Sequence, residues 1–198
     1  MLGLREMSWR HIALFSLAVA WVIFAHPDEN PWVDVLAGGA LIVLGEALRI
    51  WATGHLRKNE VLTLGGPYRY VRDPMYIGSL LIVTGFMLVG DQHALIVIFW
   101  LVFFAYYIPR KRHIECSRLL EKFGTAYADY MGAVRSMIPR LKPYQGAEQS
   151  RFAWRQCFAN NEHGIIMLLV GAAMILCVKY TLFHNHGLPM PPPLSFLF

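Results

Sequence analysis

The chain has 198 residues, of which 56% are hydrophobic and 16% are charged, and its formal net charge is +5. This composition is far more apolar than that of soluble domains, so it indicates an integral membrane protein and argues against nucleic acid as a partner. The 3 cysteines are odd in number and lack the spacing of metal ligands, which argues against both a disulfide framework and a metal site.

The amino-terminal part, residues 1–58, is predicted to form two membrane helices. Residues 12–25 follow basic residues as the apolar core of a signal peptide does, but no small-residue cleavage site comes after them, so we interpret them as a first membrane helix. A second apolar run extends from residue 32 to about residue 53. Its glycines at positions 38, 39 and 45 leave a small face against which another helix can pack closely.

Two ionisable residues, Glu46 and Arg49, interrupt the second run. They are three residues apart, so they share one face of the helix. Charged groups at membrane depth are costly, and we therefore expect the two to form a pair in the interior and consider both as candidates for binding a substrate. The alternative is a pair that extends toward the cytoplasmic surface.

Further apolar runs follow a turn-rich loop that covers residues 65–76. Residues 76–89 and 94–108 predict a helical hairpin, because a short polar turn joins them. Residues 111–130 have apolar side chains at helical spacing and charged side chains elsewhere, which predicts an amphipathic helix at the membrane surface. The remainder, residues 143–198, is predicted to be a basic connector followed by one more membrane helix and a tail.

One side of these predicted helices carries Arg5, Arg10, Arg57, Lys58, Arg69, Arg72 and the basic residues from Arg110 to Arg155, whereas Asp28, Glu29 and Asp91 fall on the other. An excess of lysine and arginine marks the cytoplasmic side of a membrane protein. The sequence therefore predicts an all-α bundle of five membrane helices, with the amino terminus in the cytoplasm and the carboxyl terminus on the opposite side. The turn-rich loop and the amphipathic helix share the cytoplasmic side.

The turn-rich loop reads Gly-Pro-Tyr-Arg-Tyr-Val-Arg-Asp-Pro-Met-Tyr-Ile-Gly from Gly66 onward. It resembles the Gly-x-Tyr-x-x-x-Arg-His-Pro-x-Tyr-x-Gly motif of the isoprenylcysteine carboxyl methyltransferases and their prokaryotic relatives. A second segment, which begins at Glu115 and includes Phe123-Gly124, Tyr127 and Tyr130, is similar to the acidic and aromatic motif that follows in the same family. The resemblance implies a methyltransferase core over residues 59–142.

The resemblance also implies S-adenosylmethionine as the cofactor. Glu115 is implied to contact this methyl donor and is also a candidate base, whereas Lys111 stands where the family has an arginine that contacts the substrate, with Arg112 as an adjacent candidate. The residues implied to bind the cofactor are Glu60, Val61, Leu62, Thr63, Tyr68, Arg72, Asp73, Pro74, Met75, Tyr76 and Glu115.

The chain departs from the family motif at Asp73, which replaces the motif histidine. Aspartate at neutral pH only accepts hydrogen bonds, whereas histidine can donate one to the carboxylate of the methyl donor. We therefore expect Asp73 to order the loop by pairing with Arg69 or Arg72, or to face the positive sulfonium. The added carboxyl-terminal membrane helix is a second departure.

Methyl transfer from a sulfonium proceeds by in-line displacement, so positioning and exclusion of water can supply much of the rate enhancement. The acceptor is expected to be a lipophilic small molecule or a lipidated substrate that enters between short helices from the surrounding membrane lipids. One alternative is an NADPH-dependent membrane reductase of the sterol-reductase type, which residues 122–130 also resemble. Another is a membrane protein without catalytic activity.

Overall fold

The computed structural model describes residues 32–58, 60–146, 150–160 and 162–186. In these ranges the chain forms helices and loops and no strand, which confirms the prediction of an all-α protein. The predicted first membrane helix, residues 12–25, lies outside the described residues. The elements are α2 (Trp32–His55), the 3-10 helix η1 (Gly66–Arg69), α3 (Pro74–Val89), α4 (His93–Val102), the π-helix η2 (Phe103–Tyr107), α5 (Ile108–Ala133), α6 (Trp154–Ala159) and α7 (Glu162–His186).

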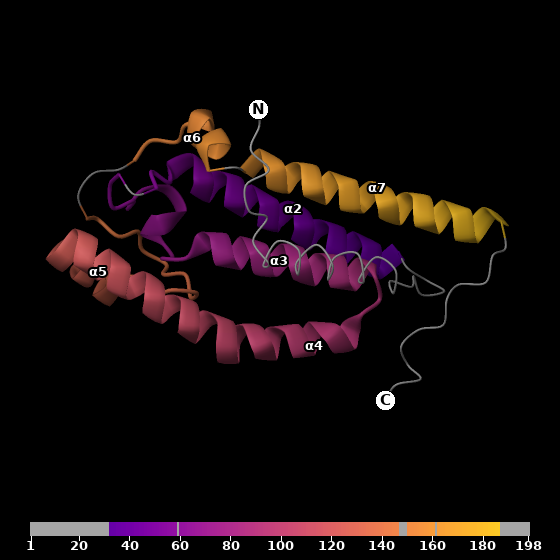
Figure 1. Cartoon of the computed structure of the whole chain (residues 1–198), viewed down its shortest axis with the longest axis horizontal. Coiled ribbons are helices and arrows are strands. Elements are labelled where there is room, and N and C mark those ends of the chain that lie inside the picture. The colour runs from indigo at the N-terminus through magenta and orange to yellow at the C-terminus, as the bar shows by residue number, and fades with distance from the viewer. Residues whose placement is uncertain (1–31, 59, 147–149, 161, 187–198) are drawn as a thin grey trace, which may run out of the picture.

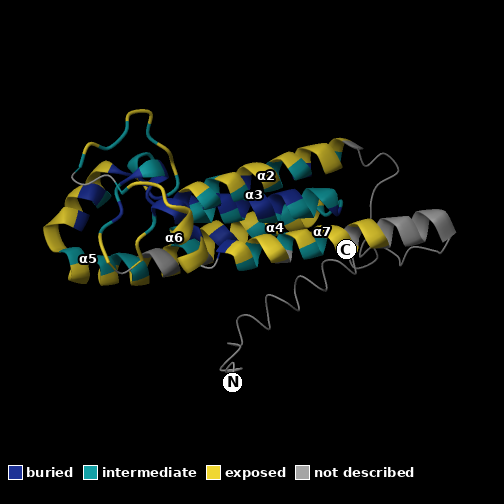
Figure 2. Ribbon diagram, turned by 90° about the horizontal axis from the view of Figure 1, so that it is seen from above, coloured by how far each residue is buried: buried dark blue, intermediate teal, exposed yellow. Residues whose placement is uncertain are grey.

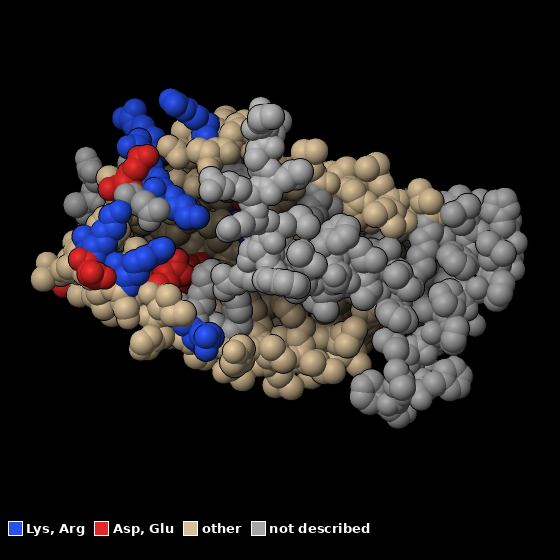
Figure 3. Space-filling model, viewed as in Figure 1, with Lys and Arg blue, Asp and Glu red and all other residues tan. Residues whose placement is uncertain are grey.

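The long helices lie side by side, and the loops gather at one end. Figure 1 shows α2, α3, α4 and α7 running alongside one another, with α5, α6 and the connecting segments at the end where α2 finishes and α3 begins. On the face seen in Figure 3, the acidic and basic side chains lie at this same end, whereas the described surface of the other end carries neither. On this face the described surface is thus divided into an apolar helical part and a charged end, while Asp34 and Asp91 lie beside His93 at the opposite end of the helices.

Two of the described helices, Val33–His55 and His93–Ala133, are long and apolar enough to span a membrane, and Pro74–Val89 and Glu162–Ile175 are shorter apolar helices. Figure 2 shows α3 as the most buried helix and exposed residues along the outer faces of α2, α4 and α7. Large apolar side chains such as Val43 are exposed there. This distribution suits helices whose outer faces contact lipid rather than water.

Helices α2 and α3 approach each other closely because glycines face glycines. A Cβ atom at Gly45 would lie 2.6 Å from the carbonyl oxygen of Gly78, and one at Gly38 would lie 2.5 Å from that of Gly85. Only hydrogen fits at such distances, so these glycines permit backbone contact between the helices. The predicted small face is therefore confirmed at Gly38 and Gly45, whereas Gly39 faces open space.

The second arm of the hairpin continues into the amphipathic helix. The sequence predicts residues 94–108 and 111–130 as separate helical segments, but α4, η2 and α5 form a continuous helical path from His93 to Ala133. Pro109 lies in the first turn of α5, directly after the π-helical turn, where the absence of its N–H is tolerated. The actual change of direction occurs at Gly124, whose φ of 56° is a left-handed conformation that favours glycine.

After this kink the chain turns back onto the loop that precedes α3. Tyr127, Tyr130 and Val134 form a buried cluster, against which Leu62 and Leu64 pack. The segment that follows α5 then runs beside residues 69–73 and exchanges backbone hydrogen bonds with them. These bonds join Arg72 to Arg135 at 2.9 Å, Asp73 to Ser136 at 3.1 Å, Arg140 to Tyr70 at 2.9 Å and Tyr144 to Arg69 at 2.9 Å.

Candidate active site

A small cavity lies where the loop before α3, the first turn of α3 and the helix α5 meet. Three residues implied by the family resemblance, Asp73, Tyr76 and Glu115, lie in its wall. The other lining residues are Ile108, Cys116, Tyr127 and Ser136. The fold therefore brings together parts of the two sequence motifs, which the hairpin separates along the chain.

Tyr76 and Glu115 connect the two motifs directly. The Tyr76 hydroxyl donates a hydrogen bond of 2.9 Å to Oε2 of Glu115. Tyr76 lies in the first turn of α3, and Glu115 lies in the second turn of α5, so each side chain is held by a helix. The hydrogen bond orients the carboxylate within the wall of the cavity.

Asp73 fastens the loop to the segment that follows α5. Its Oδ2 accepts a hydrogen bond from the Ser136 hydroxyl, and its backbone N–H donates to the Ser136 carbonyl at 3.1 Å. The predicted contact with Arg72 is present as an ion pair, with 4.0 Å between Nε and Oδ2. Arg69 instead donates from Nε to the Tyr144 carbonyl at 3.1 Å. Ser136 was not identified from the sequence, because no motif position points to it.

Arg72 and Tyr68 are buried beside the cavity and support it. Arg72 donates from Nη1 to the Met131 carbonyl at 3.4 Å, so it holds the last turn of α5 near the loop. The Tyr68 carbonyl accepts a hydrogen bond of 2.8 Å from the Tyr130 hydroxyl. Burial, and then the nearby carboxylates of Asp73 and Glu115, raise the pKa of Tyr68 well above its usual value, so its hydroxyl stays neutral.

Other residues implied to bind the cofactor lie elsewhere. Glu60 and Val61 are exposed, Leu62 packs against the tyrosine cluster, and Thr63 accepts a hydrogen bond of 3.3 Å from the backbone N–H of Arg57. None of these four residues lines the cavity, and their binding of a cofactor stays a prediction.

Pro74 and Met75 contribute to the start of α3 rather than to the wall of the cavity. Pro74 is buried, and the Met75 carbonyl accepts a hydrogen bond of 2.9 Å from the Ser79 hydroxyl. The backbones of Lys111 and Arg112 belong to α5, one turn before Glu115, but their side chains lie outside the described part of the chain. The roles implied for these four residues likewise stay predictions.

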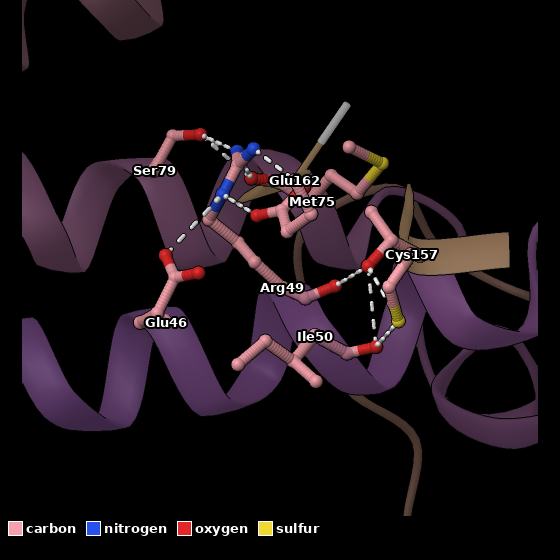
Figure 4. A network of polar contacts seen from close by, with 8 residues as sticks. Glu46, Arg49, Ile50, Met75, Ser79, Cys157 and Glu162 are labelled. Atoms are coloured by element: carbon pink, nitrogen blue, oxygen red, sulfur yellow. Dashed lines mark hydrogen bonds and ion pairs between the residues drawn. The ribbon is translucent and has the colours of Figure 1, made fainter. Parts of the chain in front are cut away.

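A second polar cluster is buried among the helices (Figure 4). The sequence predicts that Arg49 pairs with Glu46, but the main partner of Arg49 is Glu162, at the start of α7. The guanidinium donates from Nε to Oε1 of Glu162 at 2.8 Å and from Nη2 to Oε2 at 3.2 Å, whereas Oε2 of Glu46 lies 3.9 Å from Nε. Glu46 and Arg49 do not line the cavity, so the structure provides no contact between them and that site.

Comparisons with known proteins agree with this arrangement. The model of the phospholipid methyltransferase family matches residues 33–126, a range that contains the loop, the hairpin and Glu115. Cobalt-zinc-cadmium resistance protein CzcN of Cupriavidus metallidurans is 28% identical over 185 residues, which cover 90% of this chain and 82% of that protein. No solved structure matches the chain significantly. The two motifs that meet at one cavity thus lie largely within a stretch that is similar to the phospholipid methyltransferase family, which includes the isoprenylcysteine carboxyl methyltransferase-like proteins.

Proposed function

We propose that this protein is an integral membrane methyltransferase that transfers a methyl group from S-adenosylmethionine to a lipophilic acceptor. The family match supports the class of reaction. The observation that carries the proposal is the hydrogen bond between Tyr76 and Glu115, because it joins the two motifs at a single cavity.

The chemistry of the cavity wall suits a cationic donor. Asp73 and Glu115 bring carboxylates to the wall, and Tyr76 and Ser136 bring hydroxyls. Opposite charges attract more strongly in a partly buried site than in water, so the two carboxylates would favour the ammonium and sulfonium groups of the donor. A donor held by these residues would supply an activated methyl group, and its leaving group, S-adenosylhomocysteine, would be a neutral thioether.

The protein's own residues would contribute position and the exclusion of water. Tyr76 fixes the direction of the Glu115 carboxylate, and the side chains of Ile108 and Tyr127 form the apolar part of the wall. A carboxylate acceptor needs no base. A thiol or amine acceptor would need one, and Glu115 is then the candidate.

The acceptor would approach along the membrane-facing side of α4. An apolar groove lined by Ile96, Val97, Trp100, Leu101, Phe104 and Ala105 lies on α4 and η2. The same helical path continues to Ile108, which lines the cavity, so the groove and the cavity lie on consecutive turns of one helical path. A lipophilic acceptor would bury apolar surface along this path.

We further propose that the cavity faces the cytoplasm. The charged end of the molecule, which carries the basic side chains in Figure 3, also contains the loop and α5. A reporter inserted at the exposed Gln145 should then be cytoplasmic, and a reporter fused after Phe198 should lie on the opposite side. A cytoplasmic reporter at Phe198 would contradict the proposal of a carboxyl-terminal helix that spans the membrane.

Binding in detergent tests the proposed reaction. S-adenosylhomocysteine, the product of the donor, should raise the thermal stability of the protein, by about 2.7 kcal/mol at a concentration one hundred times its dissociation constant. NADPH at the same concentration should cause no shift. Stabilisation by NADPH alone would favour the reductase, and the absence of any shift would favour a membrane protein without catalytic activity.

A further inference from the structure

The segment from Ser150 to Glu162 follows the range matched by the family model, yet it packs against the end of α2 that leads into the loop. The backbone N–H of Ala153 donates to the Gly54 carbonyl at 2.9 Å. The amide nitrogen of Asn160 donates to the carbonyls of Thr53, at 3.1 Å, and Leu56, at 2.9 Å. The last carbonyls of a helix have no partners within the helix, so this segment caps α2.

The family-matched part of the chain leaves room for this segment. A Cβ atom at Gly54 would lie 2.1 Å from the ring of Phe152, and one at Gly65 would lie 2.6 Å from the Ser150 hydroxyl. Gly65 immediately precedes η1, so the carboxyl-terminal segment contacts the loop as well as the helix. At both glycines, the absence of a side chain lets the carboxyl-terminal segment pack directly against the family-matched part of the chain.

Glu162 extends this contact into the helical interior. It is almost completely buried, and its two carboxylate oxygens bind the guanidinium of Arg49 (Figure 4). The same guanidinium donates from Nη1 to the Ser79 hydroxyl at 2.6 Å and to the Met75 carbonyl at 3.5 Å. Met75 directly precedes Tyr76 in the first turn of α3. A chain of contacts therefore leads from α7 through Arg49 to the turn that carries Tyr76.

We propose that residues 150–160 and Glu162 form a positioning element for the donor site, and that Glu162 acts on this site through Arg49. Without the carboxylate of Glu162, the Arg49 guanidinium would lose its bidentate partner and retain only the longer ion pair with Glu46. The first turn of α3 would then be held less firmly, and the hydrogen bond between Tyr76 and Glu115 would open more often. Glu162 itself contacts neither the cavity nor a substrate, so its role is indirect.

Two measurements test this role. The first is the affinity for S-adenosylhomocysteine, measured by calorimetry in detergent, and it rests on the proposed function. Glu162→Ala should weaken this affinity about fivefold or more, a typical size for coupling between distant sites. Glu162→Gln, which keeps the shape and one acceptor oxygen, should restore part of the loss. Met167→Ala is the matched control, because Met167 is exposed on the same helix. In a Tyr76→Phe background, Glu162→Ala should have a smaller effect, which a general loss of stability would not produce.

The second readout needs no donor. Cys116 lines the cavity and is partly buried, whereas Cys157 is buried beside α2. The full-length protein is treated with iodoacetamide, and the rate at which each thiol is alkylated is measured by peptide mass spectrometry. Glu162→Ala should accelerate alkylation of Cys116 about fivefold, because a looser α3 turn opens the cavity more often, and Met167→Ala should not.

The two readouts separate the two proposals. If wild-type protein does not bind S-adenosylhomocysteine but Cys116 responds to Glu162→Ala, the positioning role stands and the proposed function fails. If donor affinity and Cys116 alkylation both equal those of wild type while the melting temperature falls, Glu162 is only an anchor and the positioning role is overturned. The same conclusion follows if Tyr76→Phe leaves the effect of Glu162→Ala unchanged.

Discussion

The two polar clusters on either side of the first turn of α3 contain similar groups in different surroundings. The side chains of Arg49 and Glu162 are 8% and 1% exposed, and the guanidinium carries a carboxylate partner at hydrogen-bond distance. Around the cavity, Asp73 is 22% exposed, and Asp73 and Glu115 accept hydrogen bonds from neutral hydroxyls. The buried ion pair of Arg49 and Glu162 holds α2 against α7, whereas carboxylates in a cavity wall can attract a cationic ligand. Changes in the first cluster should therefore affect stability most, and binding only indirectly through the first turn of α3, whereas changes in the second cluster should affect binding directly.

Removing Arg49 should have the largest effect. Arg49→Leu leaves Glu162 buried without its counter-ion, and breaking a buried pair in this way costs about 3 to 5 kcal/mol. The double variant Arg49→Leu with Glu162→Leu should recover much of this loss, since no uncompensated charge remains. Denaturation in detergent measures the free energy of unfolding of the single and the double variant. Equal stability of wild type and Arg49→Leu would mean that the pair contributes nothing to fastening the helices.

Glu115→Gln should produce the complementary result in the cavity. The substitution keeps the shape of the side chain and removes its charge, so the loss of one charge-assisted hydrogen bond of about 1.5 to 3 kcal/mol should weaken S-adenosylhomocysteine binding roughly tenfold to a hundredfold. The melting temperature without ligand should change little. Glu121→Gln provides the control, because Glu121 is exposed on the same helix. Unchanged affinity in Glu115→Gln would remove Glu115 from the donor site.

Gly78 tests how tightly the Arg49 cluster is enclosed. A Cβ atom at Gly78 would lie 2.5 Å from Cγ of Arg49 and 2.7 Å from the Gly45 carbonyl oxygen. Gly78→Ala should therefore destabilise the protein by about 1 to 3 kcal/mol, because the added methyl group overpacks the contact. Gly39→Ala is the control on α2, where open space allows the gain of up to about 1 kcal/mol that alanine normally brings to a helix. If both alanines were stabilising, the helices would have room to separate.

The residues around the cavity are more predictable from the sequence than those of the buried cluster, for a physical reason. The residues that meet at Tyr76 and Glu115 belong to motifs whose order and spacing are visible along the chain. The small faces at Gly38 and Gly45 were also predictable, because close helix packing selects glycine. The pairing of Arg49 was only partly predictable. Helical spacing identifies Glu46 as a neighbour of Arg49. The shorter ion pair is formed by Glu162, which is 113 residues away in the sequence and is brought to Arg49 by tertiary packing.

Backbone features account for the remaining differences. The π-helical turn before Pro109 accommodates the missing N–H of this proline, so the two predicted segments, 94–108 and 111–130, form one continuous helical path. The kink at Gly124 directs Tyr127 and Tyr130 inward, and this reversal brings Ser136 beside Asp73. No periodicity in the sequence specifies the direction of a chain after a kink. For this reason the sequence indicated the residues of the second motif but not the position of the segment that follows it.

The smallest expected effect concerns Asp73, which belongs to the cavity wall by position and to the loop by its contacts. Asp73→Ala removes the acceptor of the Ser136 hydroxyl and the ion pair with Arg72, so it should lower the free energy of unfolding by about 1 kcal/mol and affect S-adenosylhomocysteine affinity less. Asp73→His introduces the residue of the family motif and a possible hydrogen-bond donor, so it should preserve or raise the affinity. Calorimetry measures the affinity, and thermal denaturation of the same samples measures the stability.

A large loss of affinity in Asp73→Ala with unchanged stability would mean that Asp73 binds the donor rather than orders the loop. If wild type did not bind the donor but Asp73→His did, this chain would keep the architecture of the family while Asp73 directs it to a different function.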